Sequence, residues 1–92
     1  MDLSSFWVCN VDIVEIGEAI RVLAAFSGGG VEPLQFRWHG RAYEIDAVNA
    51  RWTDRSGQAC SLHFSVQVGD ETYYLRFSTE EMQWWLDRVI VE

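Results

Sequence analysis

The sequence predicts an all-β domain, or one nearly so: a small, strongly bent antiparallel sheet of five to six strands that forms an SH3-like half-barrel. Apolar and polar residues alternate without a break over residues 60–68 and again over residues 71–77. A period of two is typical of strands with one buried and one solvated face. Gly69-Asp70 between them has the chemistry of a two-residue hairpin, because glycine tolerates a positive φ. The sequence therefore predicts a β-hairpin here.

The segment over residues 6–26 is ambiguous between helix and strand. Its isoleucines recur at helical spacing, which favours an α+β alternative with a helix over residues 11–26. Against a helix, the segment is rich in β-branched residues and carries a glycine at its centre. We expect two strands, residues 6–15 and 19–26, joined by a turn at Gly17-Glu18.

A strand is predicted to open at Pro33, after a glycine-rich loop at residues 27–30. Apolar and polar side chains alternate along this strand, so one set is expected to face the core and the other to face solvent. The expected core set is Leu34, Phe36 and Trp38, and the expected solvent-facing set is Gln35, Arg37 and His39.

A tight turn is predicted at His39-Gly40, and the alternation changes parity further along the chain. The change falls between Ile45 and Val48. A β-bulge near Asp46-Ala47 would shift the parity and bend the strand, as a small barrel requires. The next turn is expected at residues 54–57.

The C-terminal segment fits two structures. Ser78 followed by Glu81 is a capping-box pattern, which predicts a helix over residues 79–88. The alternative is a turn over residues 79–82 and a last strand over 83–91, with Trp84, Leu86 and Ile90 on one face. Local patterns do not choose between them.

Composition predicts a single domain over residues 1–92, either monomeric or homodimeric. The net charge of −7 disfavours nucleic acid and anionic lipid as partners, because both are themselves negative. Cys9 and Cys60 are too far apart for a CxxC motif and are expected to be free thiols in a reducing cytoplasm. Neither a signal peptide nor a membrane-spanning run of apolar residues is visible, so we expect a cytoplasmic protein without membrane contact.

The run F-x-W-x-G-R-x-Y-x-I over residues 36–45 resembles the signature of a small bacterial domain family of unknown function. The resemblance extends from Glu18 to Val89, and His39 departs from it, since the family usually has arginine there. It implies strands after Glu18 and in the C-terminal segment, with an N-terminal extension over residues 1–17 and a β core over 18–91. Some members resemble proteins encoded near translesion polymerase genes, which implies a DNA-repair accessory role. It defines no catalytic residue.

No motif predicts an enzyme, a metal site or a cofactor. Cys60 and His63 are three apart on a strand, so their side chains are expected to point to opposite faces and cannot share an ion. Glu44 and Asp46 share a strand face but have no basic partner in the pattern. The glycines of residues 27–30 lack the Lys-Ser/Thr of a phosphate-binding loop.

The candidate binding residues form a polar face rich in arginine. They are Arg37, His39, Arg41, Arg51, Arg55, Tyr74 and Arg76. Five tryptophans exceed the need of a small core, so exposed ones are expected to mark a partner surface, with Trp84, Trp85 and Trp7 as candidates.

We therefore expect a non-catalytic interaction module that binds a protein partner, through this face or by pairing of an edge strand. The alternative is binding of single-stranded nucleic acid through the arginines and aromatics.

Overall fold

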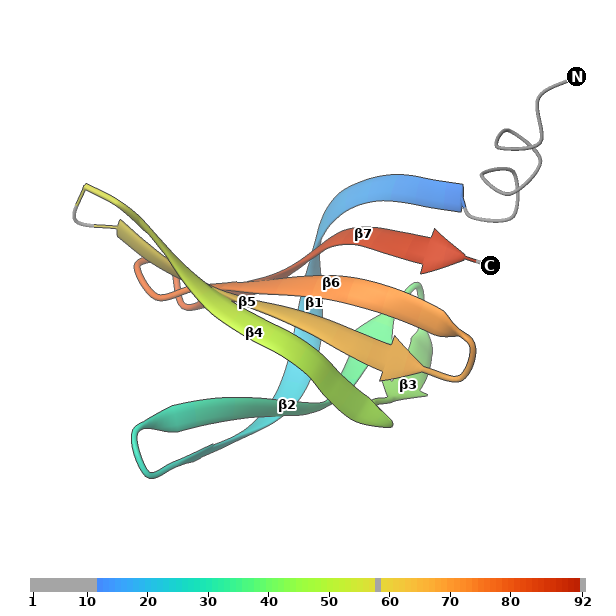
Figure 1. The fold of residues 1–92 in the computed structure, drawn as a ribbon, viewed down its shortest axis with the longest axis horizontal. Coiled ribbons are helices and arrows are strands. Elements are labelled where there is room, and N and C mark those ends of the chain that lie inside the picture. Colours follow the sequence, from blue (N-terminus) through green and yellow to red (C-terminus); the bar gives the residue numbers. More distant parts are fainter. Residues whose placement is uncertain (1–11, 58, 92) are drawn as a thin grey trace, which may run out of the picture.

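The computed structural model describes residues 12–57 and 59–91, and these fold as an antiparallel sheet of seven strands (Figure 1). The strands are β1 (Asp12–Ser27), β2 (Gly30–Trp38), β3 (Arg41–Glu44), β4 (Ala47–Ser56), β5 (Ala59–Val68), β6 (Glu71–Ser78) and β7 (Gln83–Val91). The all-β half-barrel is confirmed, with one strand more than the upper expectation. Within the described ranges there is no helix, and hence none with the length and apolar character to cross a membrane.

β1 belongs to both parts of the sheet. The strand order is β3-β2-β1-β7-β6-β5-β4. Residues 12–20 of β1 pair with β7, whereas residues 21–27 pair with β2. Figure 1 shows β1 curving across from one group of strands to the other. The molecule is therefore a larger sheet, β4 to β7 with the first half of β1, joined through β1 to a smaller one of β1, β2 and β3.

The turn predicted at Gly17-Glu18 is wrong, because β1 runs through these residues as one strand. The pairing with β7 shifts register between Glu15 and Glu18, and Gly17 has φ 67°. Glycine with positive φ serves a β-bulge as well as a turn. The bulge bends β1 shortly before it leaves β7. The part of the predicted first strand before residue 12 lies outside the described residues.

The bulge predicted near Asp46-Ala47 is also wrong, because the chain there crosses from one edge of the sheet to the other. β3 lies at one edge and β4 at the opposite edge. Between them, the Ile45 N–H donates to the Leu34 carbonyl (3.0 Å) and the Asp46 N–H donates to the Gln67 carbonyl (2.8 Å). This crossing draws the two edges together at one end of the half-barrel.

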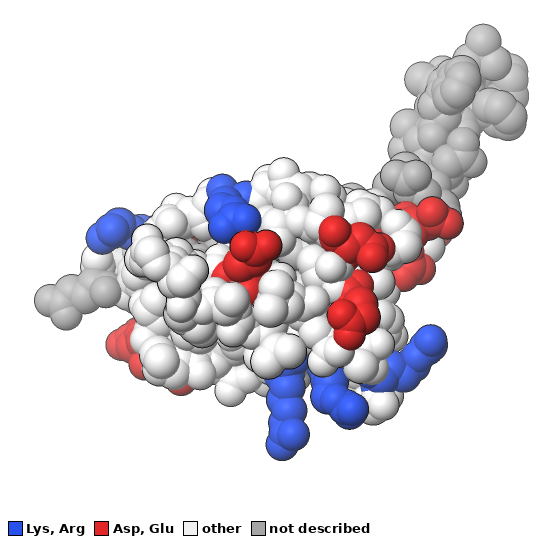
Figure 2. Space-filling model, turned by 90° about the horizontal axis from the view of Figure 1, so that it is seen from below, with Lys and Arg blue, Asp and Glu red and all other residues white. Residues whose placement is uncertain are grey.

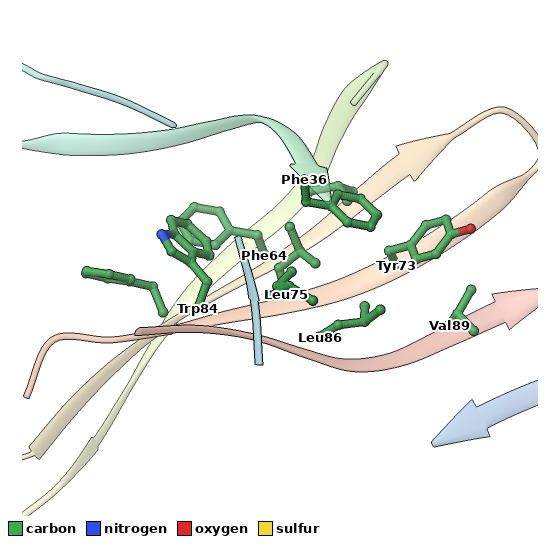
Figure 3. Close-up of a cluster of buried hydrophobic side chains, with 10 residues drawn as sticks. Phe36, Phe64, Tyr73, Leu75, Trp84, Leu86 and Val89 are labelled. Carbon is green, nitrogen blue, oxygen red and sulfur yellow. The ribbon is translucent and has the colours of Figure 1, made fainter. Parts of the chain in front are cut away.

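The core lies between the two parts of the sheet, as Figure 3 shows. Phe36 of β2 packs with its ring centroid 5.1 Å from that of Tyr73, and Trp84 lies 4.9 Å from Phe77 and 5.6 Å from Phe64. The buried apolar residues are Ile20, Phe36, Phe64, Val66, Tyr73, Leu75, Phe77, Trp84, Leu86 and Val89. Most come from β5, β6 and β7, and none comes from β4.

The helix considered for residues 79–88 does not form, although its capping hydrogen bond does. Ser78 Oγ accepts a hydrogen bond from the Glu81 N–H at 3.2 Å. Met82 then takes φ 53°, which ends the turn, and β7 begins at Gln83. The capping pattern here closes the turn between β6 and β7.

Register shifts exchange two predicted core residues for their neighbours. Leu34 is 42% exposed and Pro33 is buried instead, because the β1–β2 pairing shifts register beside them. Similarly, Ile90 is half-buried and Val89 is buried, since β7 holds an additional residue, Asp87, where it pairs with β6. Each shift moves the alternation by one position.

Candidate binding surfaces

The arginines predicted to form one face lie on both faces of the sheet. Arg37 lies on the outer face of β2, whereas Arg41 lies on the opposite face, with its guanidinium 5.7 Å from the Tyr43 ring. In β4, Arg51 and Arg55 lie opposite Phe64 and Cys60, and so share the core-facing side of that strand. Which arginines meet is set by the order of neighbouring strands, which alternation within one strand does not reveal.

Tyr74 and Arg76 lie on the outer face of the larger sheet, and Arg76 belongs to a cross-strand row that runs from β4 to β7. Register partners along this row are Trp52, His63, Arg76 and Trp85. The Trp52 and His63 rings stack, 5.3 Å apart and 7° from parallel, and Trp52 also meets Tyr74 edge-on at 6.3 Å.

Arg76 is held by its own neighbours in this row. Its Nε lies 3.1 Å from Asp87 Oδ2, and its guanidinium lies 5.3 Å from the Trp85 ring. Arg88 on the same face lies over Tyr74 at 5.4 Å and pairs with Glu15 at 3.8 Å. The guanidinium of Arg76 is therefore already neutralised and stacked.

The prediction that Trp84 faces a partner is wrong, because this side chain is 8% exposed within the core. Trp85 is half-buried on the outer face, and its Nε1 is buried without an acceptor among the described residues. Trp7 lies outside the described residues. Trp52, 45% exposed, is an outward-facing aromatic that sequence reasoning missed. A register shift between Val48 and Ala50 turns it outward, and no local pattern signals that shift.

His39 is held at the β2–β3 turn by a side chain of β1. His39 and Gly40 have φ 51° and 78°, the pair of positive values that a two-residue hairpin of type I′ requires. Glu18 Oε1 accepts a hydrogen bond from Trp38 Nε1 (3.1 Å) and lies 3.1 Å from His39 Nε2. The His39 ring also stacks on Trp38 at 4.4 Å. These contacts fix the turn against β1.

The two free edges of the sheet face each other across an open seam. We define the seam as the gap between residues 51–56 of β4 and residues 30–33 of β2, which β3 does not cover. A hollow of about 230 Å³ lies in it. Its lining residues are Gly29, Gly30, Val31, Arg51, Trp52, Thr53, Leu62, His63 and Phe64. One bond crosses it in the described structure, from Arg51 Nη1 to the Val31 carbonyl at 3.5 Å.

A second group of basic side chains lies where β1 leaves β7. Arg21 of β1 and Arg37 of β2 are direct register partners on the outer face. Figure 2 shows basic side chains on two sides of the molecule, with those at its lower edge extending furthest into solvent. Sequence reasoning passed over Arg21, since it stands alone in an acidic part of the chain, and its partner is set by the β1–β2 pairing.

The hydroxyl of Tyr73 lies in the core beside the carboxylate of Glu71. Burial of its ring, and then a 2.6 Å hydrogen bond that its hydroxyl donates to Glu71 Oε1, raise the pKa of Tyr73 far above that of a free phenol. The group is neutral at physiological pH and acts as a donor inside the core.

The described residues hold no group of three or more His, Cys, Asp or Glu side chains that could bind a metal ion. Cys60 lies half-buried on the core-facing side of β5, whereas His63 lies outward against Trp52. Cys9 lies outside the described residues.

No family model, curated protein or solved structure matches this chain. The resemblance carried by residues 36–45 therefore stays a prediction.

Proposed function

We propose that this domain is a non-catalytic module that binds an extended, acidic segment of another protein as an added strand in the seam. The observation that carries the proposal is the free edge of β4 beside the uncovered edge of β2. The domain would then belong to the binding modules that complete an open sheet with a partner's strand.

Backbone chemistry favours this occupant. Alternate residues of an edge strand direct their N–H and C=O groups away from the sheet, where they pair with water or with another strand. β4 keeps such an edge over its whole length. Its other edge is paired with β5 from Ala47 to Ser56. An incoming strand would satisfy those groups and also cover the half-exposed wall of the hollow.

Charge favours an acidic occupant, even though the whole chain carries a net charge of −7. Arg51 and Arg55 are four residues apart on the same face of β4, and Arg51 lines the hollow itself. Residues of equal parity share a strand face about 13 Å apart over four positions. A partner strand with acidic side chains at the same spacing would meet both guanidiniums.

Single-stranded nucleic acid has weaker support as the ligand. A basic track along the backbone needs arginines on one continuous surface. Here Arg37 and Arg41 lie on opposite faces of the smaller sheet, and Arg76 is paired with Asp87.

The test is an NMR titration of the ¹⁵N-labelled full chain with the blocked peptide T-V-E-V-T-V-E-V-T. The matched control has lysine in place of both glutamates. We expect amide shifts at residues 51–56 and 30–33 with the acidic peptide, and shifts at least about tenfold weaker with the basic one. Arg51→Gln and Arg55→Gln should each weaken the acidic peptide's binding.

Two proline variants separate strand addition from simple charge attraction. Thr53→Pro and Asp54→Pro remove adjacent N–H groups, of which one faces β5 and the other the free edge. The variant that loses the edge-facing N–H should stay folded, because its pairing with β5 is intact. It should nevertheless lose peptide binding. Shifts confined to other surfaces, or binding unaffected by that variant, would refute the proposal. Self-association of the free domain through β4, seen by sedimentation, would instead make a second copy the occupant.

A further inference from the structure

Two arginines stand side by side across the smaller sheet at the mouth of a separate hollow. Arg21 and Arg37 are register partners, so their Cβ atoms lie about 5 Å apart, and both side chains are exposed. The hollow has a volume of about 480 Å³, and Ala19, Ile20, Gly40 and Gln83 complete its lining. It lies away from the seam, with which it shares no residue.

Neither arginine has an acidic partner within residues 12–57 and 59–91. Glu44, in the next cross-strand row, accepts a hydrogen bond from the Gln35 amide. Glu18 is bound to the Trp38 and His39 side chains. Like charges directly opposite each other on two strands destabilise a sheet. The pair is therefore a local cost to folding that a ligand of opposite charge would remove.

One side of the hollow is held in place by hydrogen bonds of Gln83, and the side at Gly40 is open to solvent. Gln83 Nε2 donates to the Ile20 carbonyl (3.3 Å) and to the Trp84 carbonyl (2.9 Å), at the point where β1 leaves β7. A Cβ atom placed on Gly40 would meet nothing within 4 Å, so the β2–β3 turn leaves that side open. Ala19 adds only a methyl group. A small ligand can thus reach both guanidiniums together.

We infer that Arg21 and Arg37 form a binding site for a phosphoryl dianion, either free phosphate or a phosphate monoester. A guanidinium presents a planar fork of N–H donors that matches two oxygens of such a group. Two forks at cross-strand distance can bind different oxygens of one phosphoryl group, and their two positive charges balance its charge of nearly −2 at neutral pH. A phosphodiester carries a single negative charge and would balance only one of the two guanidiniums.

The site does not depend on the peptide-binding seam. Its residues lie on β1, β2, the β2–β3 turn and β7, whereas the seam depends on β4. Loss of phosphate binding would leave strand addition untouched, and the reverse also holds.

The experiment is a titration of the ¹⁵N-labelled full chain with sodium phosphate at pH 7.5, at an ionic strength held constant with sodium chloride. Parallel titrations use O-phosphoserine and a short mixed-sequence single-stranded DNA. We expect amide shifts at residues 19–21 and 37–40 with phosphate and with O-phosphoserine. Arg21→Gln and Arg37→Gln should each weaken binding at least about tenfold, since each removes a charge-assisted bidentate contact. Arg88→Gln, which removes the same charge elsewhere, should leave it unchanged.

Stability gives a second readout. Without phosphate, Arg21→Gln should be as stable as the parent or slightly more so, because cross-strand repulsion is relieved. With phosphate, the parent should gain thermal stability through linkage and the variant should not. If either glutamine variant failed to fold, Arg21→Lys and Arg37→Lys would keep the charge but lose the fork. Equal shifts in parent and variants, shifts reproduced by chloride alone, or binding confined to the DNA would each overturn the inference.

Discussion

β4 and β5 are neighbouring antiparallel strands of equal length, yet they differ in almost every residue's exposure. Both have ten residues, and they pair from end to end. Every residue of β5 is buried or half-buried, whereas in β4 only Val48 escapes exposure. Backbone pairing alone therefore does not bury a strand. β5 is covered by the smaller sheet. β4 is the edge strand, and only its hydrogen bonds to β5 along one side hold it in place.

The largest effect expected from this difference is on stability. Phe64→Ala in β5 should lower the free energy of unfolding by about 3–5 kcal/mol, because it removes a buried aromatic ring that packs against Trp84. Trp52→Ala in β4, a larger truncation, should cost under about 1 kcal/mol, the worth of a cross-strand aromatic contact. Urea denaturation measures both. If Phe64→Ala did not fold, Val66→Ala should still cost roughly 2 kcal/mol. Equal costs at Trp52 and Phe64 would break the comparison.

Hydrogen exchange sharpens the comparison residue by residue. Amides of β5 are paired on both sides of the strand, so they should exchange only through large-scale unfolding. Alternate amides over residues 51–56 face the seam and should exchange at least about a hundredfold faster. NMR-detected exchange in the free chain tests this. Uniform protection along β4 would show that its outer edge is already covered.

The side chain of Asp46, where the chain crosses from β3 to β4, should make a modest contribution to the stability of β4. Asp46 Oδ2 accepts a hydrogen bond from the Gly69 N–H at 2.8 Å. Asp46→Ala should cost about 1 kcal/mol and speed exchange at the start of β4, because this exposed bond is lost. Asp46→Asn keeps an acceptor oxygen and serves as the matched control. If the two variants were equally stable, the side chain would not be the anchor.

The smallest effect is expected at high pH. The raised pKa of Tyr73 means that the unfolded chain releases this proton at lower pH than the folded one. The contribution to stability is complete below about pH 10, the ordinary value for tyrosine, and declines as pH rises above it. Tyr73→Phe should flatten that decline in urea denaturation series from pH 8 to pH 11. An unchanged slope would contradict the assignment.

Strict alternation predicted the parts of the fold that pack the core. The β5–β6 hairpin was predicted because one face of each strand is buried along its length, and burial imposes a period of two. In the strand after Pro33 the same alternation identified Phe36 and Trp38 as inward-facing but not Leu34. The patterns at Gly17 and Ser78 did not determine the local structure, because each residue's chemistry serves two different structures. Positive φ suits a bulge or a turn, and a Ser-to-N–H bond caps a helix or closes a turn.

The candidate sites were harder to predict, because they depend on which strands are neighbours. Arg37 was identified from its outward position, but its partner Arg21 is 16 positions away in sequence and meets it only through the β1–β2 register. The seam likewise arises from a crossing at Ile45 and Asp46, which looked like a bulge because both change the parity of a strand.

The double membership of β1 also sets how the domain would respond to force. Asp12 and Val91 are register partners in the antiparallel β1–β7 ladder. Tension applied between these two residues would pull the strands apart sideways and break their hydrogen bonds one after another. A ladder loaded in this way yields gradually, whereas strands that are sheared must break many bonds together. The β1–β7 ladder would thus open inward from the end at Asp12 and Val91, and Val89 would be the first buried core residue to lose its cross-strand neighbour.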